Sequence, residues 1–541
     1  MTPEHPAAIA EALPIGHKVS SRNIAEPSRL TNLLLPSLSD LFFVALIGWL
    51  FLSHEKGWSQ LLVDADIGWH IRTGEYILAH HSVPQHDLYS FSKAGAPWFA
   101  WEWLSDVLAA LLHGWAGLKG VVLAAGVIIA WFSVTLIQRM IRAGAHPFAA
   151  LLVALSGVGA SSIHFLARPH VITLLLLSVS MWVIERDRRR SAEGAPDRRV
   201  WWLVPISLIW TNLHGGFLIL VVLLGLAAVG AAAQAWLERE ALDQNRWNAW
   251  MTGAQWSAAL RYTKLTAACA AVTFINPYGW GLHAHIIEYL RSDWIRKVVN
   301  EFQSPSFRGE SMLQFEALLF IGLMAAAANF KRHHITEGLW ILLCSYLSLS
   351  SSRHLPVYVA AVSPLVAIEI SNWWSTWTAG AGRKSALTIL NQIAKDMVPG
   401  FQRTSCIPFI GVAALAAIGA PIHWPTDFPS EMFPTAMIHK HEKEIFGARV
   451  MTTDQWADYL IYLHPAQKVY VDGRSDFYGP AVGNEFLHAV NGAPDWQQVM
   501  NQRAFQVVLL PVDTPLVQLL KQSREWRVTD DDGKQILLVR K

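Results

Sequence analysis

Long apolar runs separated by short polar stretches recur along the chain as far as residue 421. We count about eleven of them: 38–53, 104–138, 148–166, 170–184, 200–213, 216–236, 264–276, 313–330, 335–350, 355–371 and 407–421. A helix of about 20 apolar residues crosses a bilayer. Several runs are shorter than this, and the second is long enough to hold a span and an amphipathic stretch. The pattern predicts a polytopic α-helical membrane protein with about 11 transmembrane helices.

Beyond residue 421 the pattern becomes that of a small α/β domain. The stretches "TTDQWADYLIYL" (452–463) and "TPLVQLLKQ" (514–522) have helical spacing. "KVYVDGR" (468–474) and "FQVVLLP" (505–511) are typical of buried strands, and "WRVTDDDGKQILLVRK" (526–541) predicts a hairpin around its Asp-Gly turn.

Three regions follow from these patterns. We expect an N-terminal tail over 1–37, a transmembrane domain over 38–421 whose first external loop spans 54–103, and an α/β domain over 422–541. No apolar core of a cleaved signal peptide is found in the first 30 residues.

Basic residues predict the orientation. "ERDRRRSAEGAPDRR" (185–199), "KRHH" (331–334) and the stretch 383–403 fall on one side of the expected bundle. The positive-inside rule places that side and the N-terminus in the cytoplasm. An odd number of spans then places the α/β domain outside, in the periplasm if the membrane is the bacterial inner membrane.

Composition agrees with a membrane protein. The chain is 52% hydrophobic and 16% charged, whereas a soluble protein carries about 25% charged residues. Its net charge of +2 gives no electrostatic basis for binding nucleic acid. Cys269, Cys344 and Cys406 lie in or beside apolar segments, so we expect neither a disulfide framework nor a cysteine metal site.

Polar motifs gather at the outer ends of the expected spans. They are "DADIGWH" (64–70), "ARPH" (167–170), "NLHGG" (212–216), "NPYG" (276–279), "EFQSP" (301–305) and "SSRH" (351–354). Ionisable residues near membrane depth usually face a cavity and are functional candidates. The candidates are Asp64, Asp66, His70, Arg168, His170, Asn212, His214, Glu301, Arg353 and His354.

Structural explanations compete for each motif. Asp64 and Asp66 can begin an amphipathic helix, where acidic residues favour the first turn. Arg168 can reach the lipid headgroups, and His214 can cap a tight reversal between spans. The aromatic stretch "PWFAWEWLSD" (97–106) is typical of an interfacial belt, which anchors a loop or holds an amphiphilic substrate.

Arginines and histidines beside carboxylates suit a particular chemistry. Arginine binds phosphate through two parallel hydrogen bonds, and a carboxylate acts as a general base or as a ligand of a divalent metal. The set therefore suggests a lipid-linked phosphate donor and an aspartate that activates a hydroxyl. In the tail, Asp472, Arg474 and Asp476 either form an Asp-Gly turn with a local salt bridge or bind the acceptor.

The stretch "DADIGWHIRTGEYILAHHSVPQHDLYSFSKAGAPW" (64–98) resembles the first external loop of GT-C-fold glycosyltransferases, especially oligosaccharyltransferase catalytic subunits. The resemblance implies that Asp64 and Asp66, with His70 beside them, supply the catalytic base or bind a divalent metal such as Mg²⁺ or Mn²⁺. It also implies a polyprenyl-phosphate-linked sugar donor. The W-W-D-x-G acceptor motif of oligosaccharyltransferases is not matched, since "NWWSTW" (372–377) lacks the aspartate. A glycan, lipid or other protein acceptor is therefore expected.

Three functions fit these observations. The first is an inverting membrane glycosyltransferase. The second is a transporter or flippase of lipid-linked or anionic substrates, and the third is a non-catalytic membrane scaffold. Transporters place their sites at the bilayer midplane between internal repeats. The polar motifs instead gather at one face and no repeat is found, so the first function is favoured over the second.

Overall fold

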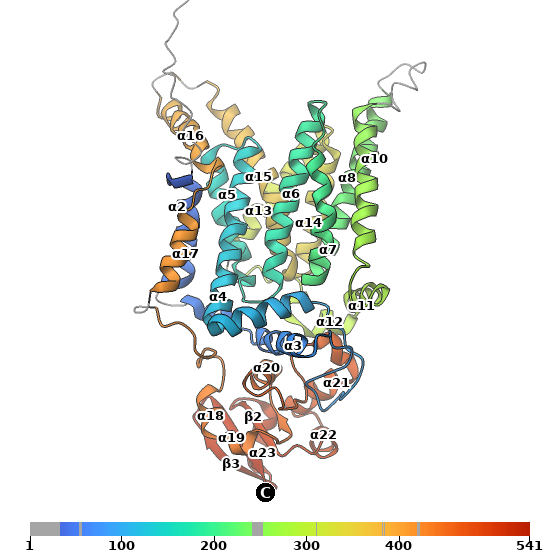
Figure 1. Cartoon of the computed structure of the whole chain (residues 1–541), viewed down its shortest axis with the longest axis vertical. Coiled ribbons are helices and arrows are strands. Elements are labelled where there is room, and N and C mark those ends of the chain that lie inside the picture. The colour runs from blue at the N-terminus through green and yellow to red at the C-terminus, as the bar shows by residue number, and fades with distance from the viewer. Residues whose placement is uncertain are drawn as a thin grey trace, which may run out of the picture.

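The computed structural model describes residues 33–53, 57–240, 253–309, 311–380, 382, 385–418 and 422–541. The described chain forms a bundle of helices with an α/β unit at one end (Figure 1). The predicted N-terminal tail, 1–37, lies almost wholly outside the described residues.

Each apolar run predicted from the sequence coincides with a helix of the bundle. These helices are α2 (Leu38–Leu52), α4 (Trp103–Arg142), α5 (Pro147–Ser161), α6 (His170–Ala192), α7 (Leu203–Leu213), α8 (Leu218–Glu240), α10 (Ala254–Val272), α13 (Met312–Lys331), α14 (Ile335–Ser350), α15 (Leu355–Thr378) and α17 (Ile407–Ala417).

Within the described ranges, five helical segments are long and apolar enough to cross a membrane: 103–142, 147–164, 215–238, 312–331 and 352–378. Helices α2, α14 and α17 are shorter but also apolar. Large apolar side chains are exposed on the bundle, as at Leu152, Phe320 and Phe409. An exposed apolar surface of this kind is satisfied by lipid. The chain is therefore a multi-pass helical membrane protein, and the count of eleven spans stays a prediction.

Helix α4 bends where it leaves the bundle. Its backbone departs from helical geometry at Ala116 and Gly117, and the latter has φ +62°. The part before the bend packs beside α3 (Asp66–His80) at the end of the bundle (Figure 1). Gly74 of α3 allows this contact, because a Cβ there would lie 1.9 Å from the carbonyl oxygen of Asp106.

Shorter elements complete the bundle. The helices are α11 (Trp280–Arg291), α12 (Asp293–Val298) and α16 (Ala386–Gln402), and the 3₁₀ turns are η1 (Gly57–Leu62), η2 (Ser162–His164), η3 (Arg198–Trp202), η4 (Gly215–Phe217), η6 (Asn300–Phe302) and η7 (Ser352–His354). Helix α16 occupies most of the stretch 383–403 that was expected to be a basic connection.

The C-terminal unit is built on a four-stranded sheet of order β1-β2-β4-β3. Strand β1 (Val450–Met451) runs parallel to β2 (Val507–Pro511), which pairs antiparallel with β4 (Gln535–Arg540), and β4 forms a hairpin with β3 (Trp526–Asp531). The helices are α18 (Thr435–Lys440), α19 (Glu442–Ile445), α20 (Asp454–Leu463), α21 (Ser475–Val490), α22 (Trp496–Gln502) and α23 (Pro515–Gln522). The predicted helices 452–463 and 514–522, the strand 505–511 and the hairpin match these elements.

The prediction of a strand over 468–474 is wrong. This segment does not join the sheet and makes one isolated bridge, between Val469 and Ser90. The Val469 N–H donates to the carbonyl of Tyr89 at 2.9 Å, and the Phe91 N–H donates to the carbonyl of Val469 at 2.9 Å. The apolar pattern is satisfied by the first external segment, which takes the place of a neighbouring strand.

Candidate active site

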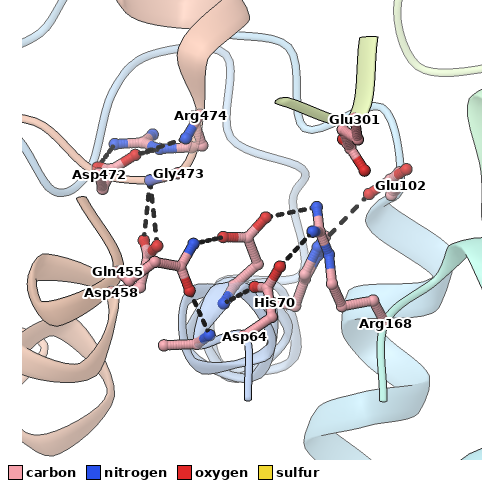
Figure 2. A network of polar contacts seen from close by, with 12 residues as sticks. Asp64, His70, Glu102, Arg168, Glu301, Gln455, Asp458, Asp472, Gly473 and Arg474 are labelled. Carbon is pink, nitrogen blue, oxygen red and sulfur yellow. Dashed lines mark hydrogen bonds and ion pairs between the residues drawn. The ribbon is translucent and has the colours of Figure 1, made fainter. Parts of the chain in front are cut away.

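Two aspartates and one arginine meet at the start of α3. Asp66 is the first residue of this helix, and its N–H donates to Asp64 Oδ1 at 2.9 Å. Arg168 lies just before α6 and binds both carboxylates (Figure 2). Its Nη1 is 2.6 Å from Asp64 Oδ2 and its Nη2 is 2.5 Å from Asp66 Oδ2. The helix-start explanation therefore holds for Asp66, and the catalytic role of the two aspartates stays a prediction. Arg168 faces protein rather than headgroups.

The C-terminal unit contacts the same aspartates. Gln455 of α20 donates from Nε2 to Asp66 Oδ1 at 3.3 Å, and its Oε1 accepts the Ala65 N–H at 2.8 Å. The Gly473 N–H donates to both oxygens of Asp458, at 3.2 and 3.1 Å. A Cβ on Gly473 would lie 2.1 Å from Asp66 Oδ1 and 2.8 Å from Asp458 Oδ2. Both carboxyl groups therefore lie against this glycine.

Burial sets the protonation of this pair. Removal from water raises the pKa of Asp66 to about 8; Arg168 opposes the shift and the charge of Asp64 reinforces it. Burial and the neighbouring Asp66 raise the pKa of Asp458 well above its usual range. Two buried carboxyl groups in contact are costly to ionise together. The effect of burial exceeds that of the ion pair with Arg168, so Asp66 and Asp458 together retain a proton near neutral pH.

A divalent metal at the two aspartates stays a prediction, because an arginine is their partner in this structure. The Oδ2 atoms of Asp64 and Asp66 are both bound by the Arg168 guanidinium, which supplies the positive charge between them. Within the part of the chain that the structure describes, no group of three or more His, Cys, Asp and Glu side chains is arranged to hold a metal ion.

A second network of polar side chains is centred on Glu102 and His70. His70 Nδ1 lies 2.6 Å from Asp106 Oδ1, and its Nε2 lies 3.5 Å from Glu102 Oε2. His214 Nε2 lies 3.4 Å from Glu102 Oε1. Because His214 Nδ1 accepts the Gly216 N–H at 2.9 Å, the ring carries its proton on Nε2 and directs it to Glu102. Burial raises the pKa of Glu102 to about 7.

Arg353 and Glu301 form the opposite side of the site. Arg353 Nη1 lies 3.2 Å from Glu301 Oε1 and donates to the Tyr289 hydroxyl at 3.2 Å. Burial alone would raise the pKa of Glu301, but Arg353 and Arg168 together lower it to about 2. Glu301 is therefore ionised and holds Arg353 in place.

These groups surround a cavity of about 530 Å³ between the bundle and the C-terminal unit. Its wall includes the predicted residues Asp64, Asp66, Arg168, Glu301, Arg353, Asp472, Arg474 and Asp476. Aromatic side chains cover much of the remainder, namely Trp69, Trp98, Phe99, Trp101, Tyr289 and Trp294. The arrangement combines cations and carboxyl groups with flat apolar surfaces, as binding of an amphiphilic anion requires.

Five predicted residues lie outside this wall: His70, His170, Asn212, His214 and His354. His170 Nε2 lies 2.7 Å from the carbonyl oxygen of His164. Asn212 accepts from the indole N–H of Trp103 at 2.8 Å and donates to two backbone carbonyls. His354 belongs to η7 together with Arg353. Asn212 and His170 therefore hold neighbouring backbone segments together at this end of the bundle.

The loop after Val471 contains a buried salt bridge. Arg474 donates to both oxygens of Asp472, at 2.8 and 2.6 Å, and lies 2.9 Å from Asp87 of the first external segment. The local salt bridge that the sequence suggested for this loop is therefore present. It also includes Asp87 of the first external segment. Asp476 pairs with His285 at 2.9 Å and faces the cavity, so acceptor binding stays a prediction for this loop.

Four residues of the site were missed: Glu102, Asp106, Gln455 and Asp458. Glu102 and Asp106 lie in the stretch that reads as an aromatic belt. The signal available was a pair of carboxylates one helical turn apart in an otherwise apolar run.

No protein-family model and no curated protein matches the sequence. Solved structures do match. The archaeal oligosaccharyltransferase AglB from Archaeoglobus fulgidus, in complex with an inhibitory peptide and a dolichol-phosphate, aligns with a TM-score of 0.54 at 11% identity, over 88% of this chain and 68% of that one. A second structure of this organism's oligosaccharyltransferase, with Zn and sulfate, aligns with a TM-score of 0.50 at 11% identity, over 88% and 67%.

ArnT from Cupriavidus metallidurans, bound to undecaprenyl phosphate, aligns over 92% of this chain and 97% of that one at 13% identity, with a TM-score of 0.43. The likeness to the oligosaccharyltransferase shows that the chain has the GT-C fold, as the resemblance of residues 64–98 predicted.

Proposed function

We propose that this protein is a membrane glycosyltransferase that moves a sugar from a polyprenyl-phosphate-linked donor to a hydroxyl group of a glycan, lipid or protein. One observation carries the proposal. A single cavity at the end of an apolar bundle holds two arginines, Arg168 and Arg353, beside the carboxyl groups of Asp64 and Asp66. The fold, shared with an oligosaccharyltransferase whose structure is in complex with a dolichol-phosphate, supports it.

Donor binding follows from the chemistry of the wall. The guanidinium groups of Arg168 and Arg353 are planar donors that match phosphate oxygens. The charge on the phosphate replaces part of their present pairing with Asp64 and Glu301. The rings of Trp69 and Trp101 supply flat surfaces on which a sugar packs, and the prenyl chain follows the apolar exterior of the bundle.

Transfer is a single displacement with inversion. The acceptor oxygen forms a bond to C1 of the sugar while the bond from C1 to the phosphate oxygen breaks, and the phosphate keeps the electron pair. Arg168 and Arg353 stabilise the charge on the leaving phosphate. In its ionised form Asp66 takes the proton of the acceptor hydroxyl, and its raised pKa makes it a stronger base than an ordinary carboxylate. Asp64 holds Arg168 and the start of α3 in place.

The acceptor binds on the side of the cavity that the C-terminal unit forms. Asp476 and the loop of Asp472 and Arg474 face the aspartates from there. This unit and the cavity lie in the periplasm of a bacterial inner membrane, with the N-terminus in the cytoplasm.

The test is release of polyprenyl phosphate from a panel of polyprenyl-phosphate sugars by the purified full-length protein. Asp66→Asn should lower turnover by about 10²–10⁴-fold, the usual contribution of a general base. Asp513→Asn is the matched control, since this aspartate is exposed and is not part of the cavity wall. Unchanged turnover in Asp66→Asn would refute the assignment of the base. A wild type that binds polyprenyl phosphate but turns over none of the sugars would favour the transporter or scaffold instead.

A further inference from the structure

A second, larger cavity lies at the end of the bundle away from the C-terminal unit. It has a volume of about 810 Å³ and is open to the surface. Its wall comes from the end of α6, the start of α10, the α13–α14 connection and the end of α15. All four segments lie at the top of Figure 1, opposite the sheet. Nothing in the proposed transfer reaction uses this cavity.

Most charges in this wall are paired. Arg188 Nη2 lies 2.7 Å from Glu337 Oε1, and Arg332 Nη1 lies 2.7 Å from Glu369 Oε2. Two further pairs reach into the wall from its back, between Glu185 and Arg139 at 2.6 Å and between Arg261 and Asp187 at 2.9 Å.

Arg189 is the exception. It lines the cavity, and no ion pair joins it to any residue in the described ranges. Because the four pairs cancel, Arg189 leaves a surplus positive charge in the wall. Arg332 is also accessible there, with 44% of its side chain exposed.

The rest of the wall contains apolar side chains together with uncharged polar ones such as Gln234, Asn329 and Asn372. Ala258, Trp340, Leu365 and Ile368 form part of it, and Pro364 interrupts the hydrogen bonding of α15 beside them. A wall that combines a surplus positive charge with apolar side chains fits an amphiphile. A volume of about 300–1,000 Å³ is that of a site for an organic molecule and far more than a phosphate ion needs.

We propose that this cavity binds the phosphate headgroup and the first acyl carbons of an anionic phospholipid. Arg189 contacts the phosphate, Arg332 borders it, and the glycerol end of the acyl chains lies against Leu365 and Ile368. The surplus positive charge attracts lipid phosphates and soluble phosphate esters alike. Only a lipid also packs against the apolar side chains of the wall. Basic pockets between transmembrane helices bind anionic headgroups in this way.

Native mass spectrometry of the full-length protein, released from nanodiscs of phosphatidylglycerol or phosphatidylcholine, tests the proposal. We expect retained phosphatidylglycerol and little phosphatidylcholine. Arg189→Gln should weaken retention by about fivefold, which corresponds to the ~1 kcal/mol of one basic residue beside an anionic headgroup. Arg190→Gln is the matched control, because Arg190 is the next residue in the chain, is exposed and lies outside the wall. A second variant, Ala254→Trp, fills the mouth without changing charge and should also release the lipid.

Three results would overturn the proposal. Equal retention of the two lipids would remove the headgroup preference. Equal losses in Arg189→Gln and Arg190→Gln would make the preference a property of the basic surface. Glycerol phosphate that binds as tightly as phosphatidylglycerol would make the cavity a site for soluble phosphate esters. Each readout is independent of glycosyl transfer.

Discussion

Replacing Gly473 by alanine places a methyl group against two carboxyl groups of the cavity. The new Cβ would lie 2.1 Å from Asp66 Oδ1 and 2.8 Å from Asp458 Oδ2. Since Cβ atoms essentially never approach another heavy atom within 3.0 Å, Asp66 has to retreat by about 1 Å. Asp66 is held on its other oxygen by Arg168 at 2.5 Å, so the movement also disturbs the arginine.

The expected cost divides between stability and rate. Overpacking of this kind usually lowers the free energy of unfolding by about 1–3 kcal/mol. A misplacement of about 1 Å at a reacting group lowers the rate by about 10²-fold. We therefore expect Gly473→Ala to lose about 10²-fold in kcat/KM for the best donor in the sugar panel, while the protein remains folded in detergent.

Gly114→Ala is the control for this variant. Gly114 lies in α4, and a Cβ there meets no heavy atom within 4 Å. Alanine favours a helix over glycine by about 1 kcal/mol, so this variant should be as active as the wild type and at least as stable. Wild-type turnover in Gly473→Ala would refute the reasoning, because it would mean that the position of Asp66 against Gly473 does not matter for transfer.

Three further predictions concern stability, each measured by thermal unfolding in detergent. Gly74→Ala should cost at least about 1–3 kcal/mol, because its Cβ would meet the backbone of Asp106, which cannot rotate away; a melting temperature equal to the wild type would contradict the close helix contact. Arg474→Gln should cost about 3–5 kcal/mol by leaving Asp472 buried without its partner; a smaller loss than in the surface variant Arg540→Gln would be inconsistent with that pair. The pKa of Glu102 is raised by burial from 4.5 to about 7, so the folded state binds its proton more tightly and stability is lost as pH rises between these values, by about 3 kcal/mol. Glu102→Gln should remove this slope, and parallel pH profiles of the two proteins would disprove it.

The apolar runs located the bundle helices because hydropathy is a local property of the chain. The same reasoning placed Asp64, Asp66, Arg168, Glu301 and Arg353 at one end of the bundle, where the structure joins them around one cavity. Spacing alone did not separate the side chains that face the cavity from those, such as Asn212, that hold loops together.

Other features depend on contacts between distant segments and left no local signal. Gln455 and Asp458 lie on an amphipathic helix whose acidic positions look like ordinary solvent-facing ones, until the C-terminal unit docks against α3. The segment 468–474 has the pattern of a strand, but its partner is the first external segment and not the sheet. The pattern correctly indicated burial and could not indicate which neighbour provides it.

The hydrogen bond from Ala65 to Gln455 joins residues 390 positions apart. Arg72 and Tyr462 are separated by the same interval, and Asp87 and Arg474 by 387 positions. During synthesis the N-terminal half of this site therefore lacks its partners until residues 455–474 have been made. Contacts so distant in sequence form late and slowly. A ribosome-bound or prematurely ended chain with the complete bundle but without the C-terminal unit would leave Asp66 uncovered, so the cavity would close only once that unit has folded.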